Sequence, residues 1–229
     1  MTTKRLRTRC HPLWLAIAAA LSLGPAHAQL PTGAQVMQGT ASIATVGKSM
    51  TIANSPNAIL NWQGFSIAAD AAVRFQQQSA ASTVLNRVVR QDPSAILGQL
   101  TSNGRVFLIN PNGILFGQGA RIDVAGLVAS TLNITDADFL ANRLNFTATA
   151  GAPAGTLLNQ GEIATPTGGQ VYPIGSSVSN EGIVTSPNGE VILAAGNSAT
   201  LVDTGTPNVR SSEFRPVNPP NKLRAAPAG

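Results

Sequence analysis

Cysteine and histidine are nearly absent from this 229-residue sequence, which contains one cysteine and two histidines. Cys10, His11 and His27 all lie within the first 28 residues. Beyond that segment the sequence therefore excludes a Ser-His-Asp triad, a Cys-His pair, a histidine general base and the usual zinc ligand sets. It also excludes disulfides, so the core has to come from backbone pairing and packing.

Long hydrophobic runs are also scarce. The clearest one, residues 13–23, is preceded by four basic residues and followed by small residues at Ala26 and Ala28. This is the pattern of a signal peptide, predicted here over residues 1–28. The run is shorter than the roughly 20 apolar residues that a bilayer-spanning helix needs, and no second candidate follows it. We therefore expect an exported chain without stable membrane insertion.

Charged residues make up only 11% of the sequence. Four of the 15 basic residues lie in the predicted signal peptide, which leaves 11 against 10 acidic residues and a net charge of +1. The basic isoelectric point of the full chain is therefore no sign of nucleic-acid binding, and we expect no such partner. Residues 204–229 are Pro-rich and carry a net +3. They are predicted to be a flexible basic tail after a folded region of residues 29–203.

Short apolar runs bounded by Gly, Asn or Pro are abundant instead, and they are typical of β-strands. Two segments, "NQGEIATPTGGQVYPIGSS" and "NEGIVTSPNGEVILAAGNS", align without gaps at an offset of 21 residues. The matched turn residues are Asn159–Asn180, Gly161–Gly182, Pro166–Pro187, Gly168–Gly189, Gly175–Gly196 and Ser177–Ser198. The matched apolar residues are Ile163–Val184, Val171–Ile192 and Tyr172–Leu193.

A period near 20 residues with several short strands predicts a parallel β-solenoid, in which the strands of successive coils pair and Gly and Asn form the corners. Residues 29–203 have room for roughly eight coils of this period. An antiparallel β-sandwich is the structural alternative, although it does not account for turns that recur at one offset. The segment around Asp92-Pro93 is predicted either as a short helix capped by Asp92 or as strand, turn and strand.

The turn Asn110-Pro111-Asn112-Gly113 separates the apolar runs "RVFLI" and "ILFG". Proline presets φ at the second position of a tight turn, asparagine bonds to nearby backbone, and glycine relieves the exit, so this segment is predicted to be a solenoid corner. The continuous apolar runs indicate strands that are covered on both faces. Because the loss of one turn contact costs about 1 kcal/mol, we expect Asn110→Ala to leave the melting temperature within a few degrees of wild type.

Several motifs in a fixed order suggest a family. They are "NWQGFSI", "LNRVV", "DPSAILGQL", "NGRVFLINPNGILFG", "GLVASTLNITDADFLA", "NEGIV" and "GEVILAAG". Together they resemble the haemagglutination-activity, or secretion, domains at the N-termini of two-partner-secretion exoproteins such as filamentous haemagglutinin and the high-molecular-weight adhesins. The resemblance covers residues 29–203. It implies an all-β, right-handed parallel β-helix with an N-terminal cap.

The resemblance also implies a function. Such domains are recognised unfolded, in the periplasm of Gram-negative bacteria, by a dedicated outer-membrane β-barrel transporter with periplasmic polypeptide-transport-associated domains. The product is secreted or displayed at the cell surface, here as a short or truncated haemagglutinin- or adhesin-like exoprotein. The family's secretion motif maps onto Asn110, Pro111, Asn112, Gly113 and Ile114. A second family motif, Asn-Pro-Asn-Leu, is matched only by "NSPNA" at residues 54–58. We expect a monomer without cofactor or metal.

Parts of the sequence also fit two other functions. A β-helix polysaccharide lyase or hydrolase works with carboxylates and basic residues, for which the candidates are Asp136, Asp138, Asp123 and Arg121. Asp136 and Asp138 are also candidates for calcium, although Thr135 or Asp136 capping a short turn or helix explains them more simply. A stand-alone adhesin would bind host or bacterial surface glycans through Trp62, Tyr172 and phenylalanines, which core packing explains better. The basic tail would then contact anionic membrane or polysaccharide, or remain a solvated linker.

Overall fold

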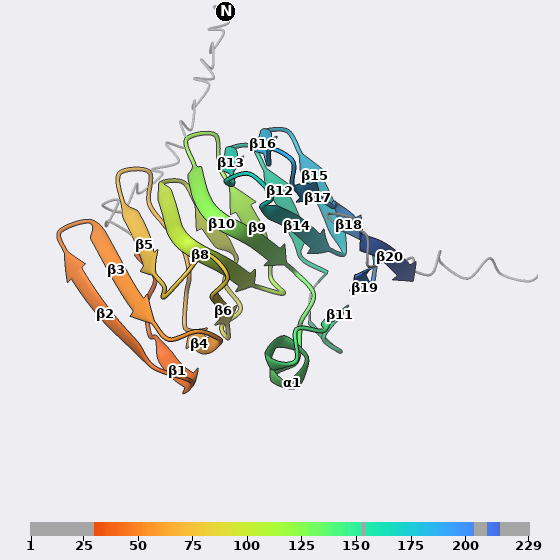
Figure 1. The fold of residues 1–229 in the computed structure, drawn as a ribbon, viewed down its shortest axis with the longest axis horizontal. Coiled ribbons are helices and arrows are strands. Elements are labelled where there is room, and N and C mark those ends of the chain that lie inside the picture. Colours follow the sequence, from red (N-terminus) through yellow and green to blue (C-terminus); the bar gives the residue numbers. More distant parts are fainter. Residues whose placement is uncertain (1–29, 153, 204–209, 216–229) are drawn as a thin grey trace, which may run out of the picture.

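The computed structural model describes residues 30–152, 154–203 and 210–215, so the predicted signal peptide lies outside it. The described chain is mostly β-strand and forms a β-solenoid of about seven turns. Figure 1 shows the strands stacked side by side along the long axis, with α1 and β11 set off to one side. The predicted all-β parallel β-helix is confirmed.

Three sheets form the described structure. The 13-stranded sheet contains β1 (Gln35–Gln38), β2 (Ala41–Val46), β3 (Ser49–Asn54), β4 (Ala58–Trp62), β5 (Ala72–Gln76), β6 (Thr83–Val88), β8 (Gln99–Ile109), β10 (Arg121–Ser130), β13 (Glu162–Ala164), β14 (Gln170–Gly175), β16 (Ile183–Thr185), β17 (Glu190–Val191) and β18 (Ala194–Ala195). The four-stranded sheet contains β7 (Ser94–Ile96), β9 (Ile114–Phe116), β12 (Thr156–Asn159) and β15 (Ser177–Asn180). The three-stranded sheet contains β11 (Leu144–Thr147), β19 (Ser198–Asp203) and β20 (Arg210–Arg215).

The N-terminal end of the solenoid is closed by antiparallel strands. β1 pairs antiparallel with β4, and β2 pairs antiparallel with β3, which in turn pairs parallel with β5. Residues 35–46 therefore form the predicted cap rather than a further coil, and β3 begins the parallel stack. This use of the chain explains why about seven turns are present where the sequence length suggested roughly eight.

The 21-residue repeat is confirmed for the first half of the coil. β12 pairs with β15 and β13 with β16 at this offset, and Asn159 Nδ2 donates to Asn180 Oδ1 over 2.7 Å. The second half is shifted by one residue: Val171 pairs with Val191 and Gly175 with Ala195. The predicted matches Val171–Ile192, Tyr172–Leu193 and Gly175–Gly196 are therefore wrong by one position.

The shift arises in the turn between the two halves. Gly168 has a left-handed φ of 79°, and Asn188, not Gly189, has the corresponding φ of 49°. A Cβ on Gly189 would lie 2.1 Å from Gly169 O, so Gly189 stacks on Gly169. The second turn is one residue shorter than the first, and asparagine replaces glycine at its left-handed position, which asparagine tolerates better than most residues.

Two apolar clusters hold the strands together. The first fills the inside of the solenoid and includes Trp62, Phe65, Phe75 and Phe116. The second lies on the outer face of the 13-stranded sheet, beneath α1 (Asp136–Leu140), β11 and β19, where Phe107 meets the ring edge of Phe139 at a centroid distance of 5.2 Å. Because the sheet is covered on both faces here, the apolar runs of β8 and β10 are continuous.

The structure decides between the two predictions for the Asp92-Pro93 segment and changes the predicted end of the fold. The Asp92-Pro93 segment is a turn between β6 and β7, so the strand-turn-strand alternative is correct and the helix is not. Strand structure also continues past Asp203, because β20 pairs antiparallel with β19 from Ser198 to Asp203. The predicted tail therefore contributes one edge strand. Backbone pairing needs no apolar period, which is why the sequence pattern did not predict it; residues 204–209 and 216–229 lie outside the described residues.

Close stacking of the coils predicts a large effect of a single methyl group. A Cβ on Gly182 would lie 2.2 Å from Gly161 O in the neighbouring coil, whereas one on Gly119 would lie 3.4 Å from Leu97 O. We expect Gly182→Ala to lower the free energy of unfolding by about 2 kcal/mol or more, and Gly119→Ala to change it by less than about 1 kcal/mol. Urea denaturation of both variants measures this. Equal stabilities would contradict the stacking of Gly182 on Gly161.

Candidate functional site

The predicted corner lies between β8 and β9. Gly113 N donates to Asn110 O over 3.1 Å, which closes a four-residue turn, and Gly113 has a φ of 127°. Asn112 N donates to Asn110 Oδ1 over 3.0 Å, so the first asparagine also caps the turn through its side chain. Each residue of the turn thus has the local role that its type predicts.

Asn110 does more than close the turn, because it joins three coils. Its Nδ2 donates to Asp92 O and to Ser94 Oγ, each over 2.9 Å, in the preceding coil. Its main-chain N donates over 2.9 Å to Ser130 O in the following coil. Asn110 is 0% exposed and its partner Ser94 is 1% exposed, so the bond between these two side chains is fully buried.

The rest of the motif is partly covered. Gly113 and Ile114 are buried, while Pro111 and Asn112 are half-buried. Asn112 Nδ2 donates to Arg90 O over 2.8 Å. Gly155 of the following coil lies against the corner, since a Cβ there would lie 2.3 Å from Pro111 O. In the folded domain, Pro111 and Asn112 therefore provide most of the exposed side-chain surface of this motif.

The segment "NSPNA" forms another corner, between β3 and β4. Asn57 has a left-handed φ of 58°, and its Oδ1 accepts from Thr83 Oγ1 over 2.6 Å. Asn54 is buried, and its Nδ2 donates over 2.9 Å to the adjacent Ser55 O. This corner lacks the bonds from a buried asparagine to a neighbouring coil that distinguish Asn110.

Residues 27–221 match the family model of the TPS secretion domain, which spans most of the chain. The chain belongs to this family. The resemblance stated from the motifs is thereby confirmed, and the protein is a secretion domain of the two-partner-secretion exoprotein type.

The relatives of this TPS secretion domain include exoproteins of Haemophilus influenzae. A heme/hemopexin-binding protein of that species is 36% identical over 180 residues, covering 75% of this chain and 20% of the relative. A second protein of the same name is 38% identical over 129 residues, covering 54% of this chain and 14% of the relative. The chain thus spans about a fifth or less of the length of these curated relatives.

A solved structure agrees with the fold. The HMW1 secretion domain from Haemophilus influenzae is 34% identical to this chain, with a TM-score of 0.76, and the match covers 82% of this chain and 50% of that chain. The family is a secretion domain and not an enzyme family.

The candidate catalytic carboxylates serve as structural partners. Thr135 Oγ1 accepts from Asp138 N over 3.0 Å and caps α1, as predicted. Arg87 of β6 donates to Asp136 Oδ1 over 2.8 Å, and Arg143 donates to Asp138 Oδ1 over 2.8 Å. Asp123 lies near the start of β10, away from α1, and Arg121 on the same strand pairs with Glu162. No group of three or more Asp, Glu, His or Cys residues that suits a metal ion occurs in the described part of the chain.

The aromatic residues weighed for sugar binding are in the core. Trp62 and Tyr172 are each 1% exposed, and Trp62 Nε1 donates to Asn86 Oδ1 over 2.9 Å. The phenylalanines whose burial the structure describes are buried as well, namely Phe65, Phe75, Phe107, Phe116, Phe139 and Phe146. Packing therefore accounts for these side chains, and the stand-alone glycan-binding alternative is not favoured.

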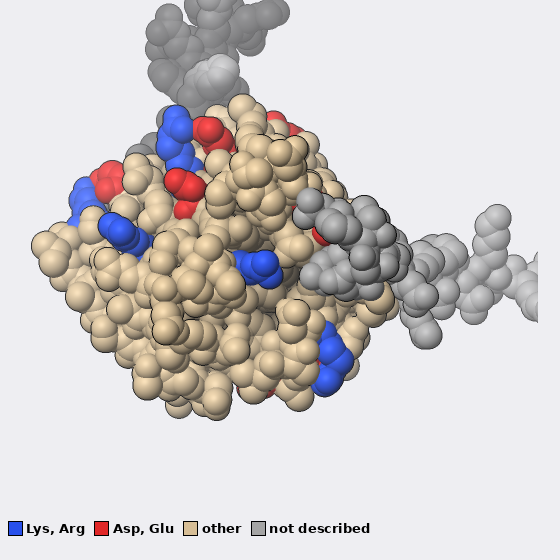
Figure 2. All heavy atoms as spheres, in the orientation of Figure 1, with Lys and Arg blue, Asp and Glu red and all other residues tan. Residues whose placement is uncertain are grey.

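Charge on the surface is sparse. On the face drawn in Figure 2, a few blue and red side chains are scattered over a mostly uncharged surface, and both signs occur near one another. No helix in the described ranges has the length and apolar character needed to cross a bilayer.

Sequence reasoning located the corner but missed its partners. Asp92 and Ser94 receive both amide hydrogens of Asn110, yet they lie 18 and 16 residues earlier in the chain. A signal was present, because both belong to the motif "DPSAILGQL", which falls about one coil length before the turn.

Burial of Asn110 corrects the small stability effect expected from a simple turn. Asn110→Ala removes the partner of Asp92 O, Ser94 Oγ and Asn112 N, and an unpaired buried polar group costs about 1 to 3 kcal/mol. We expect this variant to lose about 2 to 4 kcal/mol of unfolding free energy, and half-buried Asn112→Ala to lose about 1 kcal/mol. Chemical denaturation distinguishes these values. A loss below that of Asn112→Ala would contradict the cross-coil role.

The α1 corner should respond to acid. The Arg143 guanidinium, together with the Thr135 hydroxyl, holds the pKa of Asp138 below its ordinary value of 3.8. A lowered folded-state pKa means that this carboxylate stabilises the fold above its unfolded pKa and loses that effect as pH falls through the folded pKa. NMR titration of the Asp138 carboxyl should give a higher pKa in Arg143→Gln than in wild type. Identical titration curves would show that the ion pair does not persist in solution.

Proposed function

We propose that the unfolded chain is recognised in the periplasm by a cognate outer-membrane β-barrel transporter with periplasmic polypeptide-transport-associated domains. Residues 110–114 form part of the sequence that the transporter binds. Membership of the TPS secretion domain family supports the transporter as the partner. The folded chain is then secreted or retained at the cell surface as part of an exoprotein.

The burial of the motif is the observation that supports recognition of the unfolded chain. Asn110 is 0% exposed and Ile114 is 2% exposed in the folded domain. A transporter cannot contact these side chains once the coils have formed. If the motif is recognised through its side chains, recognition has to precede folding, and the absence of cysteine after Cys10 keeps disulfides from fixing the chain in a compact form at that stage.

Folding then hides what the transporter bound. Asn110 acquires its partners only when the coils containing Ser94 and Ser130 have stacked on either side of it. These bonds remove the side chain from the surface, so the folded domain presents a different surface from the chain that entered. Folding outside the cell therefore opposes renewed binding at this motif, and it biases the step outward.

The curated relatives carry names that refer to heme and hemopexin binding, but they extend far beyond the shared region. We propose only the shared export role for this chain. Catalysis and glycan binding are not proposed, because core packing and ion pairs already account for the residues that suggested them.

The test compares two buried asparagines with the same local geometry. Asn159 is 1% exposed, its Oδ1 accepts from Gly161 N over 3.1 Å, and its Nδ2 donates to Asn180 in the next coil. Asn159→Ala therefore removes a similar set of bonds outside the motif, with one cross-coil bond fewer than Asn110→Ala. In cells that carry the cognate transporter, we expect Asn110→Ala to reduce the secreted protein at least about tenfold more than Asn159→Ala does.

The stability of both variants and their binding to the transporter are measured together with secretion. Urea denaturation of the two purified variants gives the stability loss of each, and binding of the urea-unfolded chains to the isolated periplasmic part of the transporter gives recognition directly. Weaker binding by unfolded Asn110→Ala alone supports the proposal. If export of the two variants falls in proportion to their stability and both unfolded chains bind equally, residues 110–114 are only a structural corner.

A further inference from the structure

The outer face of the 13-stranded sheet carries two adjacent rows of side chains. The first row is apolar and runs across four paired strands through Leu85, Phe107, Val128 and Tyr172. The second lies two residues earlier on each strand and therefore faces the same way. It contains Thr83, Arg105, Gly126 and Gln170.

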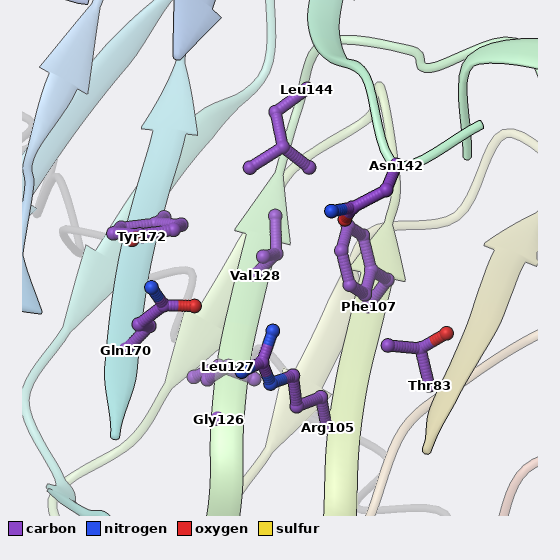
Figure 3. Close-up of a pocket in the computed structure, with 10 residues that line it drawn as sticks. All are labelled: Thr83, Arg105, Phe107, Gly126, Leu127, Val128, Asn142, Leu144, Gln170 and Tyr172. Atoms are coloured by element: carbon purple, nitrogen blue, oxygen red, sulfur yellow. The ribbon is translucent and has the colours of Figure 1, made fainter. Parts of the chain in front are cut away.

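Gly126 interrupts this second row. A Cβ there would lie 3.2 Å from Arg105 Cγ and 3.3 Å from Gln170 O, so both neighbours approach the glycine closely, and all three residues line a hollow. Figure 3 shows Arg105 and Gln170 extending toward each other on either side of Gly126, with Asn142 and Leu144 above Phe107 and Val128. The hollow is small and partly open to solvent.

Two polar side chains that line this hollow have partners, since Thr83 donates to Asn57 and Tyr172 donates to Glu190, but three others do not within the part of the chain that the structure describes. No hydrogen bond or ion pair of the Arg105 guanidinium, the Gln170 amide or the Asn142 amide occurs within the described ranges. Arg87, Arg121 and Arg143 each bind a carboxylate, whereas half-buried Arg105 lies beside an apolar floor. An arginine fork matches a carboxylate with two parallel hydrogen bonds, and an adjacent amide adds a further donor.

We propose that this hollow binds a monocarboxylate attached to a small apolar body. The carboxylate contacts Arg105 and Gln170 above Gly126, and the apolar body lies on Phe107 and Val128 beneath Leu144. Glu190 pairs with Gln170 on the far side of the row, so a second negative charge on the ligand would be repelled there. The hollow is small, which favours a small free acid or the C-terminal residue of a peptide.

The proposal is tested by titrating the full mature chain, observed by NMR, with phenylacetate and with phenylacetamide, which has the same shape without the charge. We expect phenylacetate to bind with a Kd on the order of 1 mM or tighter, and phenylacetamide to bind at least about tenfold more weakly. An acetylated tripeptide ending in phenylalanine, with a free or an amidated C-terminus, separates the two sources of the carboxylate. Tighter binding of the free-ended peptide than of phenylacetate identifies a polypeptide end as the natural ligand.

Variants assign the site. Arg105→Gln should abolish the preference for the acid, and Gly126→Ala should weaken binding of both probes because its methyl group enters the hollow. Arg74→Gln, an exposed arginine on β5, is the matched control and should bind like wild type. A saturable response that survives in Arg105→Gln, or no saturable binding of either acid to the wild-type chain, would overturn the proposal. A circular dichroism spectrum and melting curve like those of wild type show that each variant is folded.

Discussion

Each coil of this solenoid depends on hydrogen bonds to the coils beside it. β6 pairs in parallel with β8, and β8 with β10, at offsets of 21 or 22 residues, whereas β10 pairs with β14 at an offset of 44 because α1 and β11 lie between them in the chain. A single coil has neither a closed set of backbone hydrogen bonds nor a buried interior. The stability of the stack is therefore a sum of interfaces between neighbours, and a residue that contacts two neighbours, as Asn110 does, contributes to two of them.

The same dependence explains what the sequence could predict. Corners stacked in register need residues that fit close approach or left-handed backbone, so Asn159 above Asn180 and Gly161 above Gly182 recur at 21 residues. The one-residue shift in the turn that contains Asn188 was hidden, because asparagine and glycine are both acceptable at a left-handed position. An alignment that matches glycine with glycine pairs Gly168 with Gly189. In the structure, the residue with the left-handed backbone that corresponds to Gly168 is Asn188.

Contacts between segments far apart in the sequence were the part that could not be predicted. The turn at residues 110–113 followed from Pro and Gly, but the burial of Asn110 depends on which earlier residues stack beneath it. The outer cluster under α1 likewise requires knowing that Phe139 meets Phe107. The hollow at Gly126 is a further case: a glycine within a strand indicates close backbone approach or a gap, and only its neighbours decide which.

The two ends of the solenoid differ. The N-terminal end is closed by antiparallel pairing of β1 with β4 and β2 with β3, whereas the C-terminal coil leaves Ile183 62% exposed on β16. In a stack whose coils contact only their neighbours, folding can begin at any coil and propagate along the stack. Asn110 lies in the middle of the stack, so its full set of cross-coil bonds forms only after coils on both sides are in place. The motif is thus accessible for as long as the chain around it is unfolded, and the stacking that stabilises the domain is the same event that ends this accessibility.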